Sequence, residues 1–287
     1  MTLVSERSWV MGRDYWTVAT WNVNSVKSRV GLVVEWLRRT PVDILCLQET
    51  KVEDQDFPSG PFEGLGYRCE VFGQRAYNGV ALCARVPLAD VWKGFGDSLW
   101  DEQKRIIGAT VGDVHVINVY VPHGDVRGTE KFRYKLDFYR YLIDFLDRRW
   151  TPDDPLCLVG DLNVARSDLD VWDPEALRDT IGTMPEERQA LESLLQWGFV
   201  DAFRHRYPNR RQFTWWDYIG GRIWKDEGMR IDYVLVTPPL LPRLRDVRVD
   251  LWPRRRRTPT PSDHAPVIGE FGAVSPHGHR AVGPMGK

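Results

Sequence analysis

The pattern of hydrophobic and polar residues divides the chain into short apolar runs separated by polar segments. Eight of these runs have the length of strands and are rich in β-branched residues. They cover residues 16–23, 43–49, 67–73, 78–86, 115–122, 156–163, 231–236 and 265–271. Eight strands are more than one small sheet usually holds, so the pattern predicts more than one sheet.

Apolar residues also recur at helical spacing in three segments between the predicted strands. The predicted helical faces are Val26, Val30, Val33 and Leu37; Phe132, Leu136, Tyr139, Ile143 and Leu146; and Leu191 and Leu195, in a helix from about Pro185 to Gly198. Several predicted strands are apolar on both faces, so their outer sides need a cover. The expected fold is therefore α/β, with two packed sheets flanked by helices.

The bulk properties favour one soluble domain. No segment in the middle of the 287 residues has the composition of a linker, so residues 15–272 are expected to form a single domain. Residues 1–14 and 273–287 are polar or rich in Gly and Pro, and both are expected to be flexible extensions. The first residues lack the apolar run of a secretion signal, and no apolar stretch is long enough to span a membrane. These features favour a cytoplasmic protein.

The four cysteines, Cys46, Cys69, Cys83 and Cys157, lie in or beside apolar runs without metal-ligand spacing, and they are expected to be buried, reduced thiols. A net charge of -1 does not indicate a general nucleic-acid binder. Basic residues are nevertheless concentrated in residues 127–140, 204–211 and 254–257. A basic rim around an acidic centre would suit a metal-dependent enzyme that acts on a polyanion.

Candidate chemistry lies at the carboxyl ends of the predicted strands. Asn22, Glu49, Asp161 and Asn163 each follow an apolar run, and such strand ends are where sheet proteins place their sites. A lone Glu at this position is more often a capping or salt-bridged residue. Likewise, an Asp two residues before an Asn is common in local turns. The combination of these residues is more informative than any one of them.

Two further segments complete this set of polar residues. Asp263 and His264 precede the last predicted strand, and Asp232 stands at the start of the strand before it. A His beside one acid and oriented by another is suited to proton or phosphate chemistry, although a lone His is more often structural. Carboxylates and amides favour Mg²⁺ over Zn²⁺, with Mn²⁺ as a possible substitute. The set therefore predicts metal-assisted hydrolysis of a phosphate ester.

The sequence contains a series of distinctive short segments, TWNVNSVKSR, DILCLQETK, NGVAL, KRII, VYVP, GDLNVA, PEER, WGFVDAFRH, FTWWDY, GMRIDYVLV and PSDHAPV. In these segments it resembles the exonuclease III and apurinic/apyrimidinic (AP) endonuclease family of the DNase I-like phosphodiesterases. The segments occur in the family's order, and the resemblance covers nearly everything from Trp16 to Phe271. The resemblance implies a four-layer αββα sandwich of two mixed sheets.

The resemblance also implies a role for each matching residue. The residues implied to lie near the metal are Glu49, Asn22, Asn24, Asp161, Asn163 and Asp263, with Glu49 as the chief ligand. Its catalytic residues are Tyr120, Asp161, Asn163, Asp232 and His264. Asp161 would orient or deprotonate the attacking water, and His264, oriented by Asp232, would stabilise the transition state. Asn24 departs from the aspartate that some relatives carry.

The implied substrate is double-stranded DNA. The implied reaction cuts the phosphodiester 5′ to an abasic site, removes nucleotides or blocking groups from 3′ ends, or does both, and it leaves a 3′ hydroxyl. The implied DNA-binding residues are Arg105, His123, Arg127, Lys131, Trp215, Trp216, Met229 and Ile231. The last four would form a tight pocket for a flipped abasic sugar, although aromatic residues are often simply core. Residues 254–257 either reach the DNA or form a solvated surface.

Two other functions compete with this prediction. A different phosphodiesterase of the superfamily, such as an inositol polyphosphate phosphatase, a sphingomyelinase or an RNA deadenylase, would have a similar metal centre. A DNA-binding relative without activity would have lost a residue that the chemistry needs, yet Glu49, Asp161, Asn163 and His264 are all present. Nothing in the sequence indicates more than a monomer.

Overall fold

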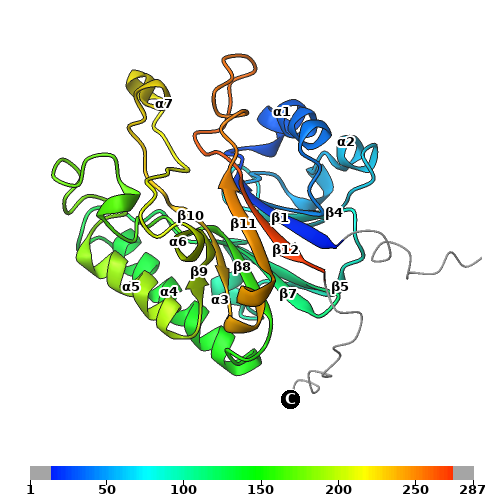
Figure 1. Cartoon of the computed structure of the whole chain (residues 1–287), viewed down its shortest axis with the longest axis horizontal. Coiled ribbons are helices and arrows are strands. Elements are labelled where there is room, and N and C mark those ends of the chain that lie inside the picture. The colour runs from blue at the N-terminus through cyan, green and yellow to red at the C-terminus, as the bar shows by residue number, and fades with distance from the viewer. Residues whose placement is uncertain (1–13, 274–287) are drawn as a thin grey trace, which may run out of the picture.

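The computed structural model describes residues 14–273, which form two six-stranded mixed sheets (Figure 1). The first sheet has the order β11-β12-β1-β2-β4-β3 and the second has the order β5-β6-β7-β8-β10-β9. The strands of the first sheet are β11 (Leu244–Val249), β12 (Val267–Gly272), β1 (Tyr15–Asn22), β2 (Ile44–Gln48), β4 (Val80–Ala84) and β3 (Arg68–Phe72). Those of the second are β5 (Ala89–Lys93), β6 (Ile106–Val111), β7 (Val114–Tyr120), β8 (Leu156–Asp161), β10 (Asp232–Val236) and β9 (Val200–Asp201).

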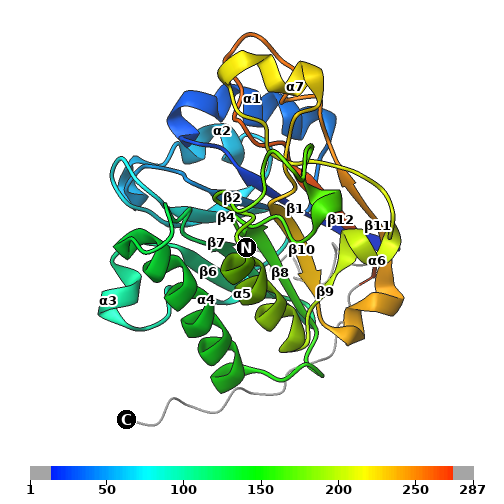
Figure 2. The ribbon, with the colours of Figure 1, turned by 90° about the vertical axis from the view of Figure 1, so that its left-hand side faces the viewer.

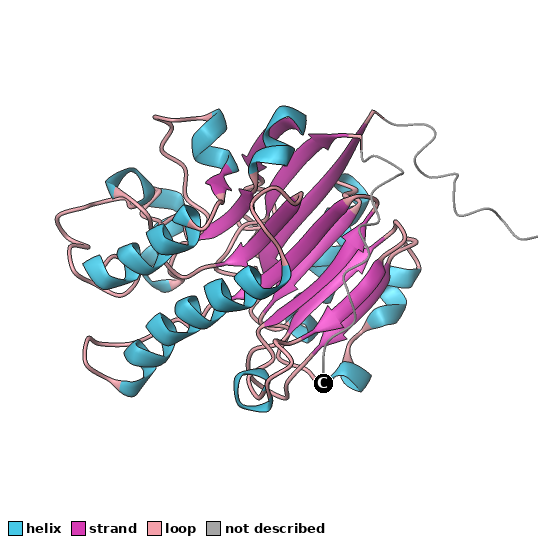
Figure 3. Cartoon of the chain, turned by 90° about the horizontal axis from the view of Figure 1, so that it is seen from below, coloured by secondary structure: helices cyan, strands magenta, loops and turns pink. Residues whose placement is uncertain are grey.

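Helices cover the outer face of each sheet, which produces four layers (Figure 3). The first sheet is covered by α1 (Val26–Arg39) and α2 (Ser59–Glu63), and the second by α4 (Glu130–Arg149) and α5 (Pro185–Gln196), which lie side by side in Figure 2. The remaining helices are α3 (Ser98–Asp101), α6 (Ala202–Arg206), α7 (Arg222–Lys225), η1 (Asp54–Asp56), η2 (Asp168–Asp170), η3 (Ile219–Gly221) and η4 (Pro238–Arg243). The expected αββα sandwich is confirmed.

The hydrophobic core has three main parts. One lies between the two sheets, where side chains such as Val18, Val116 and Val159 are fully or almost fully buried. The other two lie between each sheet and its helices. Burial of strands on both faces explains why their sequences are continuously apolar, because neither face contacts water.

The eight predicted strands and the three predicted helices are confirmed, but four strands were missed. The missed β5 and β11 lie at sheet edges and carry exposed polar residues, β9 has only two residues, and β6 contains a glycine. The buried face of α4 is also displaced from the prediction. Leu136 and Ile143 are only partly buried, whereas Lys135 and Leu142 are fully buried.

The expectation of four reduced cysteines is wrong for one pair. Cys69 in β3 lies opposite Cys83 in β4, and the two form a disulfide. Their Cα atoms are 4.0 Å apart, because directly opposed residues of antiparallel strands approach closely. Sequence spacing alone does not give this register. Cys46 and Cys157 are free and buried, as expected.

None of the helices between residues 14 and 273 combines the length and the apolar character that a membrane span requires. The expected flexible extensions fall almost entirely on residues 1–13 and 274–287, which lie outside the described residues. That expectation stays a prediction.

Candidate active site

Strand register brings the predicted polar residues to one edge of the two sheets. In the second sheet, Tyr120 of β7 pairs with Asp161 of β8, which in turn pairs with Asp232 of β10. In the first sheet, Asn22 ends β1 opposite the last residue of β2, and Glu49 follows directly. The Asn22 amide joins the sheets, because its Nδ2 donates to Glu49 Oε1 at 2.8 Å and to Asp161 Oδ2 at 2.9 Å.

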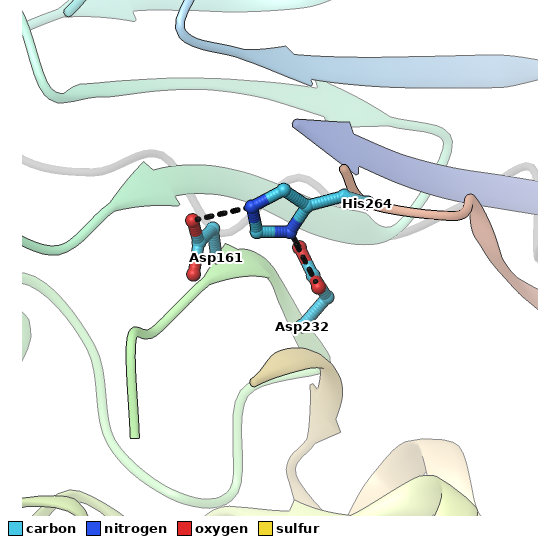
Figure 4. Close-up of side chains that lie close together, drawn as sticks. All are labelled: Asp161, Asp232 and His264. Carbon is cyan, nitrogen blue, oxygen red and sulfur yellow. Dashed lines mark hydrogen bonds and ion pairs between the residues drawn. The ribbon is translucent and has the colours of Figure 1, made fainter. Parts of the chain in front are cut away.

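His264 lies between two carboxylates, as Figure 4 shows. Its Nδ1 is 2.9 Å from Asp232 Oδ2, and its Nε2 is 3.7 Å from Asp161 Oδ2. The ring is held from its backbone as well, since the His264 N–H donates to the Ser262 hydroxyl and its carbonyl accepts from the Trp21 indole. All three side chains of this group are buried. The predicted orientation of His264 by Asp232 is thus present in the structure.

Burial and charge together set the protonation of this group. Burial lowers the pKa of His264, but the carboxylates of Asp232 and Asp161 outweigh it and raise the net pKa. Burial raises the pKa of Asp161, and the imidazolium offsets only part of that increase. The site therefore combines a cationic imidazole with a carboxylate whose proton affinity is unusually high. Such a pair is able to take a proton from water and to stabilise an anion.

Glu49 is held in one orientation by three neighbours. Its Oε1 accepts from the Asn22 amide and from the Tyr120 hydroxyl at 2.9 Å, and its Oε2 lies 2.9 Å from the Lys51 ammonium. Burial raises the pKa of Glu49, but the Asn22 hydrogen bond and the Lys51 charge lower it more, so its net pKa is lowered. The Glu49 backbone has a φ of 51°, and such strained residues concentrate at functional sites.

Oxygen atoms suited to a metal ion lie around Glu49. Lys51 Nζ is 2.6 Å from Asn24 Oδ1, and Asn24 Nδ2 donates to Asp263 Oδ1 at 3.2 Å. The Lys51 ammonium thus stands between the side-chain oxygens of Glu49 and Asn24, which already surround one positive charge. A second group that could hold a metal consists of Asp161, Asp232 and His264, whose ligand atoms lie within 4.8 Å of one another.

Sequence reasoning missed a buried ion pair beneath the site. Lys135 of α4 and Glu187 of α5 are fully buried and 2.5 Å apart. The same Lys135 ammonium donates to the backbone carbonyls of Asn163 at 2.7 Å and of His123 at 3.1 Å. The Asn163 amide in turn donates to the Val121 carbonyl at 2.9 Å. A lysine on the apolar face of α4 was the available sequence signal, because a buried ammonium needs such partners.

A second missed network lies under the start of β10. The buried guanidinium of Arg230 contacts Asp170 Oδ1 and Asp201 Oδ2, both at 2.7 Å. Asp170 also contacts Arg204 at 2.5 Å. Arg230 stands between Met229 and Ile231, so this network fixes the backbone that carries both apolar side chains. An arginine inside an apolar strand start was the signal that could have revealed it.

A cavity of about 210 Å³, here called the catalytic cavity, opens between these groups. Its polar wall includes Glu49, Tyr120, Asp161, Asn163, Asp263 and His264, and its other lining includes His123, Trp215, Met229 and Ile231. Trp215 Nε1 donates to Asp263 Oδ2 at 3.0 Å. Trp216 does not line the cavity, contrary to the prediction. It is fully buried against Phe213 and Ile223, because successive residues of an extended segment face opposite sides.

The structure gives the predicted DNA-binding cations different positions. Arg105 is buried and packs on the Tyr120 ring, with its guanidinium 4.7 Å from the ring centre. Arg127 is exposed but forms ion pairs with Asp179 and Glu186. Lys131 has an exposed side chain, 3.9 Å from Asp125. Arg105 therefore positions Tyr120, and the DNA contacts of Arg127 and Lys131 stay predictions.

The basic run at residues 254–257 does not act as one unit. Arg254 is buried and donates to the backbone carbonyls of Asp263 at 3.1 Å and of Trp216 at 2.8 Å. It therefore holds the segment that carries His264. Arg255 and Arg257 are exposed, and Arg256 lies 3.7 Å from Glu35. Only part of the run is thus available to a DNA backbone.

The sequence and the fold match known nucleases. Residues 19–264 match the model of the endonuclease/exonuclease/phosphatase family. Exodeoxyribonuclease III of Haemophilus influenzae is 34% identical over 264 residues, which cover 88% of this chain and 98% of that protein. An AP endonuclease from Archaeoglobus fulgidus superposes with a TM-score of 0.85 at 37% identity and covers 89% of this chain and 99% of its own.

A 3′ phosphatase from Neisseria, solved with a product DNA hairpin, superposes with a TM-score of 0.83 at 39% identity. The match covers 89% of this chain and 99% of that chain. Sequence and fold thus agree over most of the molecule. The chain belongs to the endonuclease/exonuclease/phosphatase family, in its branch of exonuclease III and AP endonucleases.

Proposed function

We propose that this protein is a Mg²⁺-dependent DNA repair phosphodiesterase. Its substrate is double-stranded DNA, which it cuts 5′ to abasic sites, trims from 3′ ends, or both, leaving a 3′ hydroxyl. The observation that carries the proposal is the position of His264 between Asp232 and Asp161 in a cavity that Glu49 also lines. The names of the relatives, an exodeoxyribonuclease III, an AP endonuclease and a DNA-bound 3′ phosphatase, support the same substrate.

The chain's own residues supply the acid–base chemistry. The Asp161 carboxylate orients a water molecule and accepts its proton as the water oxygen attacks phosphorus. The raised pKa of Asp161 suits this role near neutral pH. The His264 imidazolium offsets the negative charge that grows on a non-bridging phosphate oxygen, and Asp232 keeps its ring in place. Asn163 Nδ2 retains a second N–H that is able to bind the phosphate.

The oxygen donors beside Glu49 fit Mg²⁺, which prefers one or two carboxylates and several waters. Glu49, Asn24 and Asp263 would hold the ion, and the partly exposed Lys51 ammonium would have to leave its place between Glu49 and Asn24. A bound Mg²⁺ would offset charge on the phosphate and on the leaving oxygen. Burial raises the pKa of Glu49, but the Asn22 hydrogen bond lowers it independently of Lys51, and this favours an ionised carboxylate for the ion.

The apolar part of the catalytic cavity suits an abasic sugar. Trp215, Met229 and Ile231 form a small apolar wall beside the polar groups. Flipping a sugar without its base out of the helix costs little energy, and a narrow cavity excludes nucleotides that keep their base. This wall supports incision at abasic sites. The relatives named as an exodeoxyribonuclease and a 3′ phosphatase support activity at 3′ ends as well.

The test is cleavage of a 5′-labelled duplex with one abasic analogue, beside its undamaged twin, with Mg²⁺, with Mn²⁺ and with chelator. We expect a metal-dependent cut 5′ to the lesion, shortening of both duplexes from their 3′ ends, or both. Failure of a folded preparation to cleave either duplex would overturn the proposal. Release of phosphate from inositol polyphosphates by the same preparation would then favour the phosphatase alternative.

A further inference from the structure

A second cavity of about 510 Å³, here called the outer cavity, opens beside the catalytic cavity. The two share His123, Ile181, Trp215 and Met229 as lining residues, so they adjoin along a common wall. Half of the other lining residues of the outer cavity lie between residues 172 and 184, in the loop between β8 and α5, and the rest lie at residues 126–127 and 217–227. Nothing in the proposed incision of an abasic sugar uses this space.

The walls of the outer cavity suit an uncharged, flat group. Trp172, Leu177 and Met184 contribute apolar surface. Among the charged lining residues, Arg127 pairs with Asp179 and Arg222 lies 3.9 Å from Glu227, while Asp217 accepts a hydrogen bond from the Ile219 N–H. Paired charges leave little net field to attract a phosphate. Aromatic and apolar walls favour a planar ring system that stacks on them.

The relative sizes of the two cavities indicate how a nucleotide would divide between them. The catalytic cavity, at about 210 Å³, lies below the range of about 300–1,000 Å³ that is usual for a drug-sized ligand. It has room for a phosphate and a sugar but little more. A nucleotide that keeps its base needs additional space, and the outer cavity provides it along the shared wall.

We propose that the outer cavity holds the base of the nucleotide that the enzyme removes from a 3′ end. This inference rests on the proposed function and specifies its substrate class as intact nucleotides. The base would stack on Trp172, with its sugar near Trp215 and its phosphate near His264. Water adds to phosphorus and gives a proton to Asp161, the bond from phosphorus to the 3′ oxygen of the preceding nucleotide breaks, and that oxygen takes up a proton from solvent to become the new 3′ hydroxyl. The terminal nucleotide leaves with its 5′ phosphate. An abasic sugar leaves the outer cavity empty.

Two variants test this division of the substrate. Leu177→Trp fills the outer cavity, and Trp172→Ala removes the stacking ring. Each is expected to lower 3′ to 5′ removal of normal nucleotides by about tenfold or more, because stacking on an aromatic side chain contributes strongly to base binding. Incision at an abasic site should stay within about twofold of the wild type, because an abasic sugar has no base to place there.

Arg178→Trp is the matched control for the filling variant. Arg178 is the next residue of the same loop, is exposed and lines a neighbouring cavity instead. It should change neither activity. Circular dichroism and thermal unfolding check that each variant is folded. Should Leu177→Trp fail to fold, Trp172→Ala decides.

A binding measurement on the wild type gives an independent readout. A duplex with 2-aminopurine as its 3′-terminal base, bound in chelator to prevent cleavage, should show quenched fluorescence that Trp172→Ala restores. Equal loss of both cleavage activities in Leu177→Trp would overturn the inference and assign the outer cavity to the strand beyond the lesion. Retention of full exonuclease activity in both folded variants would overturn it as well. Failure of the proposed function is distinguishable, because the wild type would then cleave neither substrate.

Discussion

The catalytic centre and the loops around it use polar side chains in different ways. In the centre, short side chains at strand ends reach one another directly, as when Asn22 contacts both Glu49 and Asp161. In the loops, long cationic side chains often contact their own chain. Arg127 pairs with two acids, and Arg254 donates to two backbone carbonyls. Strand register fixes the geometry of the centre, whereas the partners in the loops depend on how each loop folds.

This contrast separates the residues that take part in the reaction from those that hold the loops in place. The position of a buried carboxylate at a strand end is fixed by the backbone of its strand, so its orientation follows from the sheet. A long arginine side chain has several possible partners within reach, and nearby acids or carbonyls often take it. Substitutions in the centre should therefore affect rate, whereas substitutions of buried, paired arginines should affect folding. The predictions below test this division.

The largest effect is expected for Asp161→Asn. The amide keeps the size of the side chain and an oxygen that can accept from the Asn163 N–H, but it does not accept a proton from water. Cleavage should fall roughly 10²–10⁴-fold, the usual contribution of a positioned acid or base. DNA binding, measured by fluorescence anisotropy in chelator, should stay near the wild-type value. Substantial remaining turnover would remove Asp161 from the role of water activation.

Arg230→Met should destabilise the fold by about 3–5 kcal/mol, the usual cost of removing one partner of a buried ion pair. The variant leaves Asp201 without the guanidinium that it contacts at 2.7 Å, in a position 1% exposed. Urea unfolding measures the loss. Arg243→Met is the control, because its pair with Asp113 is partly exposed and should contribute about 1 kcal/mol or less. Equal losses in the two variants would contradict the importance of the buried network.

Much of the fold was predictable because buried strands and helices have recognisable patterns of apolar residues. Strands such as β2 and β8 are apolar on both faces, and that pattern identifies them without further information. The pattern does not identify β11, because it is an edge strand with charged residues. The Cys69–Cys83 disulfide was missed for a related reason. It depends on the register between β3 and β4, which no local pattern specifies.

The centre of the site was predictable from strand ends, but its supports were not. His264 and Asp232 are 32 residues apart and meet as expected. Trp215 and Trp216 are adjacent and indistinguishable by type, yet only Trp215 reaches the cavity. Lys135 was overlooked because a lysine on a helix normally faces water. Its place on the apolar face of α4 was a signal of burial, and the structure supplies the reason in the partner Glu187.

Asp232→Asn tests whether the carboxylate of Asp232 is what raises the pKa of His264. In the wild type the pKa of His264 is raised above its ordinary value, because the neighbouring carboxylates outweigh burial. The variant removes one carboxylate while keeping an oxygen that is able to accept from Nδ1, so the pKa should fall. NMR titration of the imidazole protons, assigned with His264→Gln, measures it. An unchanged pKa would assign the effect to Asp161 instead.

The same substitution has a definite sign in a stability measurement. A raised pKa in the folded state means that the charged imidazole stabilises the fold. This contribution is complete below the unfolded value of about 6.5 and is lost as pH rises through the folded pKa. The difference in melting temperature between wild type and Asp232→Asn should therefore be largest in mild acid and smaller in alkali. A difference that grows with pH would contradict this electrostatic account.

The smallest effect is expected at the basic run, where the contrast between loops and centre is sharpest. Arg255 and Arg257 are exposed, and replacing both with Ser should weaken DNA binding several-fold and flatten its salt dependence by about 0.9 per lost phosphate contact. Arg254→Ser should instead lower thermal stability, because it removes the donors to two backbone carbonyls, of which that of Trp216 is buried. Binding is measured across salt concentrations in chelator. An unchanged salt slope in the double variant would make the exposed arginines a solvated surface, and a flattened slope in a stable Arg254→Ser protein would return that residue to the DNA.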